Sequence, residues 1–251
     1  MLSDTITPDL SGRHVLIPGG TGGVGEGAVR GYLAAGADVV VPTRSQQRAE
    51  EFRAVLGDAA SSHLHLVLHD YSTFAGAEAL VAIMEERLGS VDDVVAPIGG
   101  WWAGKRLWEI DESDWHSAFV GLATTHMAVL RAALPRMKAG GAYSIIVGAS
   151  AFTPVPGSGL VSMEQAALLM MQQVLAAELA GDQDKRVFVL QLGPVSTRLS
   201  HAAADADWVS ADQIGAVAVA AAAAAGVAGR PLRLLSRAEA DDALSIFKVT
   251  R

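Results

Sequence analysis

The chain of 251 residues is long enough for one large α/β domain or two small ones, and 51% hydrophobic residues with 26 glycines supply a sizeable core. This composition excludes a disordered or fibrous protein. The balance of 19 basic and 27 acidic residues gives a net charge of −8, so we expect no nucleic-acid partner. The absence of cysteine excludes a disulfide framework, a thiolate metal site and a cysteine nucleophile, and it agrees with the cytoplasm, where we expect the protein.

The sequence has no pattern typical of a targeting or membrane-spanning segment. Residues 1–10 carry two acids and no apolar run, so they do not resemble a secretory signal. The longest apolar run, residues 214–229, is mostly alanine and is shorter than the roughly 20 strongly apolar residues that a membrane span requires. We therefore expect no membrane association.

Short apolar runs alternate with amphipathic stretches of helical length along the chain. The runs typical of strands are 14–17, 38–41, 63–68, 93–96, 144–147, 187–190 and 232–235. The helical patterns are 23–35, 45–56, 75–88, 112–138, 160–180 and 211–228. The strands are apolar on both faces, as in a parallel sheet covered by helices on each side. The sequence therefore predicts an α/β fold, a Rossmann-like doubly wound parallel sheet of about seven strands flanked by helices, in a single domain over residues 1–251.

A glycine-rich turn, residues 18–25 (PGGTGGVG), joins the first strand to the first helix. Such a turn lets the backbone approach a pyrophosphate, while the helix that follows offers free N–H groups and the positive end of its dipole. The turn alone is a weak signal, but its place at the start of a β-α series strengthens it. It predicts a dinucleotide site, and the alternative is a turn that is merely tight.

With this placement, the chain resembles the short-chain dehydrogenase/reductase family over residues 12–236. The family turn Thr-Gly-x-x-x-Gly-x-Gly is matched by three glycines, with Pro18 in place of the threonine. Later matches keep the family order: HDYS at 69–72, Trp115, LRAALP at 130–135, AAL at 166–168, LAAEL at 175–179 and GPVST at 193–197. The resemblance implies an NAD(P)-binding oxidoreductase in which Asp70 contacts adenine and residues 193–197 hold the nicotinamide carboxamide.

The resemblance assigns contacts at both ends of the dinucleotide. Thr43 stands where NAD-preferring members carry an aspartate for the ribose 2′-hydroxyl, and Arg44 can neutralise a 2′-phosphate, which favours NADP(H) over NAD(H). Alternatively, Arg44 is a solvent-exposed residue at the start of a helix and has no part in cofactor binding. The residues expected to bind the cofactor are Gly19, Thr21, Gly23, Val24, Gly25, Thr43, Arg44, Asp70, Tyr71, Gly99, Gly193, Val195 and Thr197.

The catalytic pattern of the family is largely missing. The family uses Ser, Tyr, Lys and a helix Asn, and the Lys lowers the pKa of the Tyr. Aligned on the flanking motifs, the Tyr position falls on Val161, the Lys position on Gln165 and the Asn position on Leu122. Of the four, only Ser150 remains as a candidate catalytic residue, with a hydrogen bond to backbone as its alternative role. The one nearby tyrosine, Tyr143, begins the fifth strand and is expected at the wrong end of the sheet.

Two further departures belong together. The family sequence Asn-Asn-Ala-Gly after the fourth strand reads APIG at 96–99, and its first Asn normally supports the loop in which Pro18 replaces the threonine. Because losing a positioned general acid typically costs about 10²–10⁴ in rate, we expect no measurable reduction of simple aldehydes or ketones by NADPH.

Three other groups of residues have competing interpretations. The loop 100–108 (GWWAGKRLW) carries three tryptophans that either line an apolar ligand pocket or pack against the sheet or another subunit. Histidines at 63, 65 and 69 alternate along the third strand, but we expect no carboxylate or cysteine beside them and predict no metal site. Ser158, Ser162 and Glu164 supply a substitute acid or cap a helix, and capping is the simpler interpretation.

Three functions remain open. The first is an NADP(H)-dependent oxidoreductase that acts on a small molecule. Its proton donor in place of the tyrosine would be water, Ser150, Ser158, Ser162 or Glu164, or its substrate would need little help from an acid. A non-catalytic member would keep the dinucleotide for sensing, structure or assembly, and a lyase or isomerase would reuse the crevice. The nicotinamide-end segment, Gly193–Thr197, favours the first.

We also expect a homodimer or homotetramer, because family members commonly pair the two helices that correspond to 112–138 and 160–180. Both helical patterns carry apolar stripes that could form this interface. Burial against the sheet alone is the alternative. The stripes include Ala128, Leu130, Leu134, Leu168, Met171 and Leu175.

Overall fold

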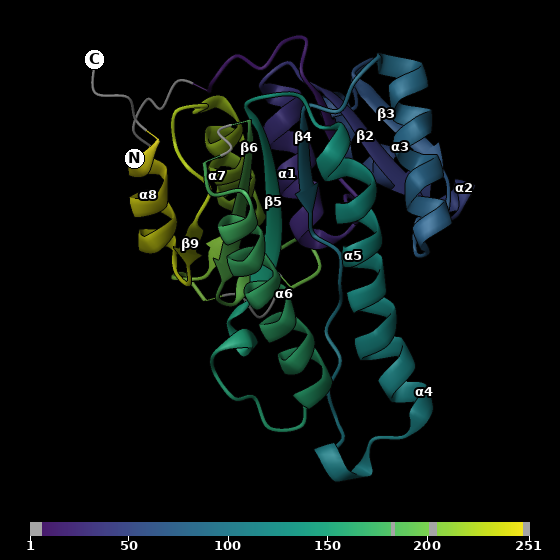
Figure 1. Ribbon diagram of the computed structural model, residues 1–251, viewed down its shortest axis with the longest axis vertical. Helices are drawn as coiled ribbons and strands as arrows, with labels where there is room; N and C mark the ends of the chain where they lie inside the picture. Colours follow the sequence, from purple (N-terminus) through teal and green to yellow (C-terminus); the bar gives the residue numbers. More distant parts are fainter. Residues whose placement is uncertain (1–6, 182–183, 201–204, 248–251) are drawn as a thin grey trace.

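A computed structural model describes residues 7–181, 184–200 and 205–247 (Figure 1). Its centre is a seven-stranded sheet in the order β3-β2-β1-β4-β5-β6-β9, and every neighbouring pair is parallel. The arrangement confirms the predicted doubly wound sheet. The strands are β1 (His14–Leu16), β2 (Asp38–Thr43), β3 (Leu64–Leu68), β4 (Asp93–Ala96), β5 (Gly141–Gly148), β6 (Lys185–Leu192) and β9 (Pro231–Leu234).

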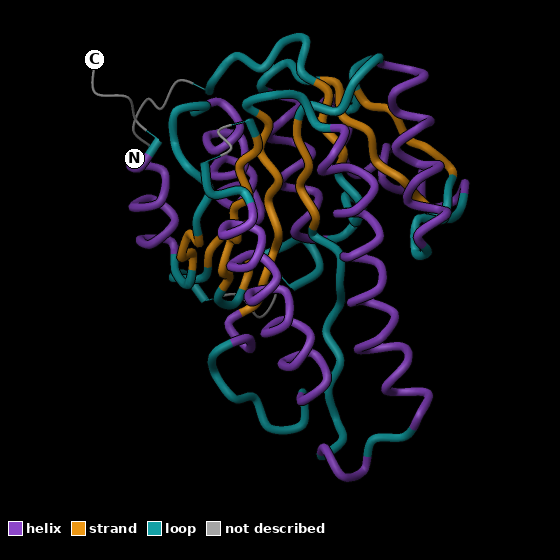
Figure 2. Tube along the Cα trace, in the orientation of Figure 1, coloured by secondary structure: helices purple, strands orange, loops and turns teal. Residues whose placement is uncertain are grey.

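Helices cover both faces of the sheet, and each face has its own apolar core (Figure 2). Side chains such as Val29 and Ile214 fill one core, and Leu80 and Val129 fill the other, which removes their apolar surface from water. The helices over the first core are α1 (Gly23–Ala34), α2 (Gln46–Leu56), α7 (Ala211–Ala223) and α8 (Arg237–Ile246). Those over the second are α3 (Phe74–Leu88), α5 (Gly121–Ala133) and α6 (Gly159–Glu178).

The strand order reverses between β1 and β4, because the chain first moves outward through β2 and β3 and then returns to the other side of β1. In open α/β sheets a ligand crevice forms outside the carboxyl ends of the strands at such a point. The loops after β4 and β5, the short helix α4 (Glu112–Trp115) and the first turns of α6 extend beyond that end of the sheet, at the bottom of Figure 1.

Several elements differ from the prediction. The helix expected over 112–138 is divided into α4, a π-helical turn at His116–Val120, α5 and a 3₁₀ turn at Leu134–Arg136. Pro135 has no N–H to continue the α-helical ladder, which explains the end of α5. Helix α8 and the two short paired strands β7 (Val195–Ser196) and β8 (Val209–Ser210) were not predicted. A two-residue strand is too short to show a hydrophobic period.

Helices α1 and α7 approach each other through backbone rather than side chains. A Cβ atom at Gly27 would lie 2.0 Å from the carbonyl oxygen of Ala211, and one at Gly215 would lie 2.2 Å from the carbonyl oxygen of Gly27. Neither position can hold a larger residue without moving a helix. This contact places the start of α7 beside the first turns of α1, which leave the glycine-rich turn.

Two helical stretches, Glu112–Arg136 and Gly159–Glu178, are long and apolar enough to cross a membrane by length and composition. The sequence analysis had considered only the run at 214–229. Core helices meet the same criterion, and both stretches contribute side chains such as Val129 and Leu168 to the core beneath them. Their length and composition are therefore weak support for a membrane span.

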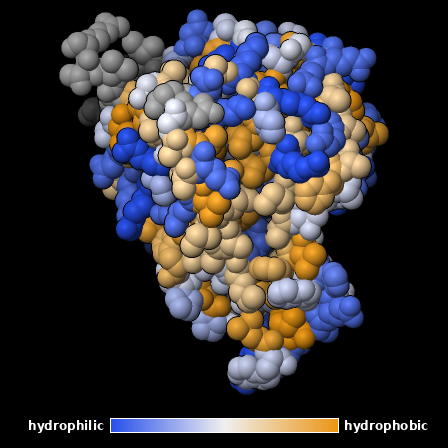
Figure 3. Space-filling view, viewed as in Figure 1, coloured by the Kyte–Doolittle hydropathy of each residue, from blue (hydrophilic) through white to orange (hydrophobic). Residues whose placement is uncertain are grey.

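Three of the six apolar residues expected at a subunit interface lie in the core instead. Ala128, Leu130 and Leu168 are buried, and Leu134, Met171 and Leu175 pack partly buried against the same cluster. The prediction was wrong about the three buried residues, because a helical stripe also fits packing onto a sheet, and for the partly buried ones a subunit contact stays a prediction. Apolar side chains do gather on the outer surface over α5 and α6 (Figure 3), and the exposed ones, 43% to 57% accessible, are Met127, Met163, Met170 and Val174.

Candidate functional site

The glycine-rich turn is held against the segment that follows β4. Gly19 has φ +86°, and a Cβ atom there would lie 2.4 Å from the carbonyl oxygen of Pro97. A Cβ atom at Gly25 would lie 2.4 Å from the carbonyl oxygen of Gly19. Helix α1 begins at Gly23, and its N-cap, Gly22, provides no side-chain cap. The first N–H groups of α1 are therefore available to an anionic ligand.

The segment after β6 lies directly over this turn. A Cβ atom at Gly23 would lie 2.9 Å from both Cβ and Oγ1 of Thr197, so the threonine side chain covers the glycine. Gly193 is needed at the start of the segment, because a Cβ atom there would lie 2.2 Å from the carbonyl oxygen of Leu235. The structure thus brings together Gly23 and Thr197, which the resemblance places at one binding site.

An ion pair that the sequence analysis missed ties this segment to α1. Arg198 Nε lies 3.2 Å from Glu26 Oε2, and Arg30 NH2 lies 3.0 Å from Glu26 Oε1. Glu26 is nearly buried, so the pairing compensates part of the cost of desolvating its carboxylate. A shallow hollow of about 360 Å³ opens here, and its lining includes Gly23, Glu26, Arg30, Thr197 and Arg198.

Two arginines stand at the end of β2. Thr43 is buried, Arg44 is exposed, and Arg48 Nε donates to Thr21 Oγ1 over 3.1 Å. Arg48 therefore reaches from α2 to the glycine-rich turn. Arg48 was not among the predicted cofactor residues, although it lies in the first turn of the helix that follows Arg44.

The remaining predicted cofactor residues border the same crevice or support it. Asp70 accepts a hydrogen bond from the backbone N–H of Ser72 over 3.0 Å, and this contact together with the Ser72 hydroxyl lowers the pKa of the carboxyl. Burial raises the pKa of Tyr71, against the opposing effect of Arg44. Val24 and Val195 are half-buried against the core, and Gly99 follows β4 in open surroundings. Their part in cofactor binding stays a prediction.

Val161, at the expected tyrosine position, is buried and has no acidic group that could donate a proton. Gln165, at the expected lysine position, uses its Oε1 to accept a hydrogen bond from the backbone N–H of Gly148 over 2.5 Å. An ammonium group has no acceptor atom, so a lysine could not make this contact. The side-chain oxygen of Ser150 also lies beside Gly148, 3.7 Å from where a Cβ atom would stand. Ser150 and Gln165 therefore converge on the last residue of β5.

A buried acid and a buried histidine lie behind Gln165. Glu164 is 0% exposed, and its Oε2 accepts a hydrogen bond from Gln165 Nε2 over 2.5 Å. His126 of α5 is 1% exposed, donates from Nε2 to the carbonyl oxygen of Ile98 over 2.9 Å, and lies 3.8 Å from Glu164 Oε1. Burial raises the pKa of Glu164 to about 7, against the opposing effect of Gln165, and burial lowers the pKa of His126 to about 4.

The side chains of Ser158, Ser162 and Glu164 do not cap the start of α6, so the capping interpretation was wrong. Ser158 is the N-cap of α6, but its hydroxyl makes no cap hydrogen bond and is buried without a partner among the described residues. The Ser162 hydroxyl donates to the carbonyl oxygen of Ser158 over 3.0 Å, and Glu164 faces inward. Tyr143 is fully buried in the core of the sheet, and burial raises its pKa far above the usual range, so it is no substitute acid.

The tryptophan loop projects away from the sheet. Trp101 and Trp108 are 69% and 78% exposed, and Trp115 stacks on Phe119 with ring centroids 4.5 Å apart. The loop is fastened to the segment before α6, where the Gly104 N–H donates to the carbonyl oxygen of Gly157 over 2.9 Å. Packing onto the sheet, one of the expected alternatives, is therefore wrong for Trp101 and Trp108.

The histidines of the third strand have a carboxylate partner that the sequence analysis did not expect. His63 Nδ1 and His65 Nε2 lie 3.2 Å and 2.8 Å from the same oxygen of Asp38 on β2. His69 instead contacts the carbonyl oxygen of Gly76. Within the described ranges, no group of three or more His, Asp or Glu side chains is placed to hold a metal ion.

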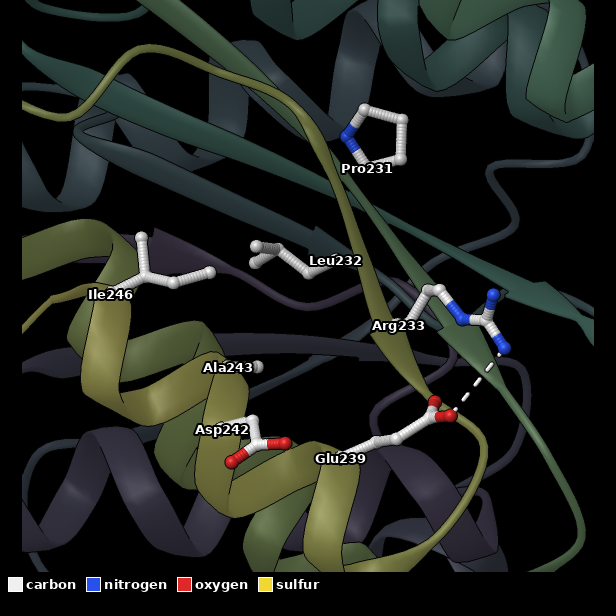
Figure 4. A pocket seen from close by; sticks show the side chains of 7 residues that line it. All are labelled: Pro231, Leu232, Arg233, Glu239, Asp242, Ala243 and Ile246. Carbon is white, nitrogen blue, oxygen red and sulfur yellow. Dashed lines mark hydrogen bonds and ion pairs between the residues drawn. The ribbon is translucent and has the colours of Figure 1, made fainter.

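A second surface hollow, of about 370 Å³, lies between β9 and α8, away from the glycine-rich turn (Figure 4). Arg233 and Glu239 form an ion pair of 3.4 Å at its rim, and Leu232 and Ile246 provide apolar walls. It contains none of the residues that the sequence analysis assigned to a function.

The fold and the glycine-rich turn define a dinucleotide-binding α/β protein, and comparison with known proteins gives its family. A family model described as "Enoyl-(Acyl carrier protein) reductase" matches residues 19–240. Dehydrogenase/reductase SDR family member 4 of Mus musculus is 30% identical over 198 residues, which cover 76% of this chain and 68% of the relative. The human mitochondrial protein named Dehydrogenase/reductase SDR family member 2 is 30% identical over 193 residues, with the same coverage. The chain belongs to the short-chain dehydrogenase/reductase family.

Solved structures agree on the fold. A short-chain dehydrogenase/reductase from Brucella melitensis aligns with a TM-score of 0.79 at 21% identity and covers 91% of this chain and 97% of its own. A short-chain dehydrogenase from Burkholderia cenocepacia, solved in complex with NADP, aligns with a TM-score of 0.78 at 22% identity over 90% of this chain and 97% of its own. The family binds NAD(P), and its members include oxidoreductases.

The ionisation of Glu164 should make stability depend on pH. Its pKa is raised in the folded chain, so its favourable contribution is complete below about pH 4.5 and is lost as the pH rises through about 7. Glu164→Gln cannot ionise, so its free energy of unfolding relative to the parent should rise by on the order of 3 kcal/mol between these limits. Urea unfolding at several pH values measures the difference. A difference that does not change with pH would contradict the buried, ionisable state of Glu164.

Proposed function

We propose that this protein is an NADP(H)-dependent oxidoreductase with a non-standard active site. The observation that carries the proposal is the pair of arginines at the end of β2. Neither Arg44 nor Arg48 forms a salt bridge with a described residue, although the charge of Arg44 acts on Asp70 and Arg48 contacts Thr21 of the glycine-rich turn. Two guanidinium groups near this turn suit a ribose 2′-phosphate, which a guanidinium can bind through two parallel hydrogen bonds.

The other residues fit the rest of the cofactor. The free N–H groups at the start of α1 suit the pyrophosphate, and Thr197, which covers Gly23, suits the nicotinamide end. When bound, the cofactor supplies the hydride, and the chain binds and orients it. The complex of the Burkholderia cenocepacia dehydrogenase with NADP is consistent with this assignment.

A second candidate function is dinucleotide binding without catalysis. It is favoured by one observation: the two positions expected to carry Tyr and Lys hold Val161 and Gln165, and the amide of Gln165 is already engaged by Gly148 and Glu164. No feature of the described residues favours a lyase or isomerase. We keep the cytoplasm as the proposed location, with a small molecule as ligand and neither nucleic acid nor membrane as partner.

We expect NADPH to bind at least several-fold more tightly than NADH. Arg44→Ala and Arg48→Ala should each weaken NADPH binding by about tenfold, the usual range for a charge-assisted hydrogen bond, and leave NADH binding unchanged. Titration of cofactor fluorescence measures both affinities. Arg53→Ala is the matched control, because Arg53 is exposed in the last turn of the same helix, α2. Equal affinities of the parent for the two cofactors would exclude the NADP(H) assignment.

Simple carbonyls should remain unreduced by NADPH even when the protein is saturated with cofactor. Hydride transfer needs a proton at the new alkoxide, and Val161 supplies none while the hydroxyl of Ser150 is a poor acid. Loss of NADPH absorbance with a panel of aldehydes and ketones tests this expectation. Robust turnover that survives Ser150→Ala would show that another group delivers the proton to these substrates.

We also propose a homodimer or homotetramer formed through the outer faces of α5 and α6. Its support is the exposed apolar side chains on both helices, among them Met127, Met170 and Val174. Exposed apolar surface of this kind is typical of subunit contacts.

Light scattering at micromolar concentration should give a multiple of the chain mass for the parent protein. Met170→Glu combined with Val174→Glu should give monomers, because the interface would then bury carboxylates without partners. Ile246→Glu places one such carboxylate at an exposed apolar position of α8 and should leave the mass unchanged. A monomeric parent would rule out the assembly.

A further inference from the structure

A chain of polar groups, with one gap of 3.8 Å between His126 and Glu164, joins the ends of β4 and β5 beneath the crevice. It runs from the carbonyl oxygen of Ile98, two residues after β4, through His126 and Glu164 to Gln165. Gln165 completes it by accepting from the N–H of Gly148, the last residue of β5. Two helices and two strand ends therefore meet at one buried carboxyl group.

The network is incomplete in its centre. Glu164 Oε1 and His126 Nδ1 are buried without a hydrogen-bond partner among the described residues, as is the hydroxyl of Ser158 at the start of the same helix. Buried polar atoms in proteins nearly always have partners, and an unpaired carboxylate is costlier than a neutral carboxyl group. The geometry therefore favours a proton on Glu164.

No cation offsets this preference. Among the titratable groups on the elements packed against α6, only His126 lies within ion-pair distance of Glu164, and its pKa is lowered by burial, so it is neutral at physiological pH. Arg131 pairs with Glu78, His116 pairs with Glu112, and Lys185 and Arg186 donate to carbonyl oxygens. The groups considered are His126 and Arg131 on α5, His116 in the π-helical turn, Tyr143 on β5, and Lys185 and Arg186 on β6.

We propose that Glu164 is a proton store linked to the charge of the bound cofactor: it keeps its proton while the bound nicotinamide ring is neutral and releases it to solvent when the ring is cationic. This inference rests on the proposed NADP(H) function. Binding of NADP⁺ then shifts the carboxyl group toward the carboxylate and, for a pKa shift of about one unit, frees up to about half a proton per site near neutral pH, without any change in oxidation state. Binding of NADPH, whose ring is neutral, frees none.

The physical link is electrostatic. Gln165 and Gly148 stand at the carboxyl end of β5, beside the point where the sheet order reverses and ligands bind. At an effective dielectric constant of about 20, a full positive charge about 12 Å away shifts the pKa of a carboxyl group by about one unit. Solvent screens a buried group much less than an exposed one. Glu164 thus acts on the bound cofactor through its charge and is not placed to touch substrate.

The test compares the two oxidation states of the cofactor. The affinity for NADP⁺ relative to NADPH should rise about fivefold from about pH 6 to about pH 8, because the carboxylate that favours NADP⁺ forms in this range. The 2′-phosphate also titrates near pH 6, but it is common to both cofactors and cancels in the ratio. Calorimetry of NADP⁺ binding in two buffers with different ionisation enthalpies should detect the released proton directly.

Glu164→Gln, which keeps an acceptor for Gln165 but cannot ionise, should abolish both the pH dependence of the ratio and the proton release. Glu178→Gln is the matched control, since Glu178 is an exposed acid on the same helix, and it should retain both. If the parent binds both cofactors with a ratio that does not change with pH, the proton store is refuted while the proposed function stands. If the parent binds neither, both proposals fail.

Discussion

The contact between Gly19 and the carbonyl oxygen of Pro97 is the constraint on which the ligand crevice depends. It holds the turn after β1 against the chain leaving β4, at the point where the strand order reverses. Only a glycine with positive φ allows this approach, because a Cβ atom would lie 2.4 Å from the oxygen. The contact aims the start of α1 into the crevice, and Thr197 covers the turn from the other side.

Gln165 links the end of β5 to a buried acid. Its side-chain oxygen accepts a hydrogen bond from the N–H of Gly148, which a lysine ammonium group could not do. The other end of the same amide contacts Glu164, whose raised pKa follows from burial beside a neutral histidine. This part of the crevice therefore holds a buried acid beside a neutral amide, and the acid makes its charge depend on pH.

Sequence reasoning was strongest where one local signal sufficed. Strand and helix periods gave the correct sheet, and the glycine spacing located the turn, because both depend on residues near each other in the chain. Sequence reasoning was weakest where the same pattern fits two different environments in the fold. The stripe through Leu130 and Leu168 fits an interface as well as a core, and Glu164 fits a helix cap as well as a buried acid.

By itself, the sequence determined the doubly wound sheet and the family, since these follow from pattern and residue identity. Only the tertiary structure decided the contact of Arg48 with Thr21 and the meeting of His126, Glu164 and Gly148, which lie on separate elements. The same holds for the burial that raises the pKa of Glu164 to about 7. Desolvation depends on every neighbour that excludes water, and those neighbours are brought together only when the helices pack on the sheet.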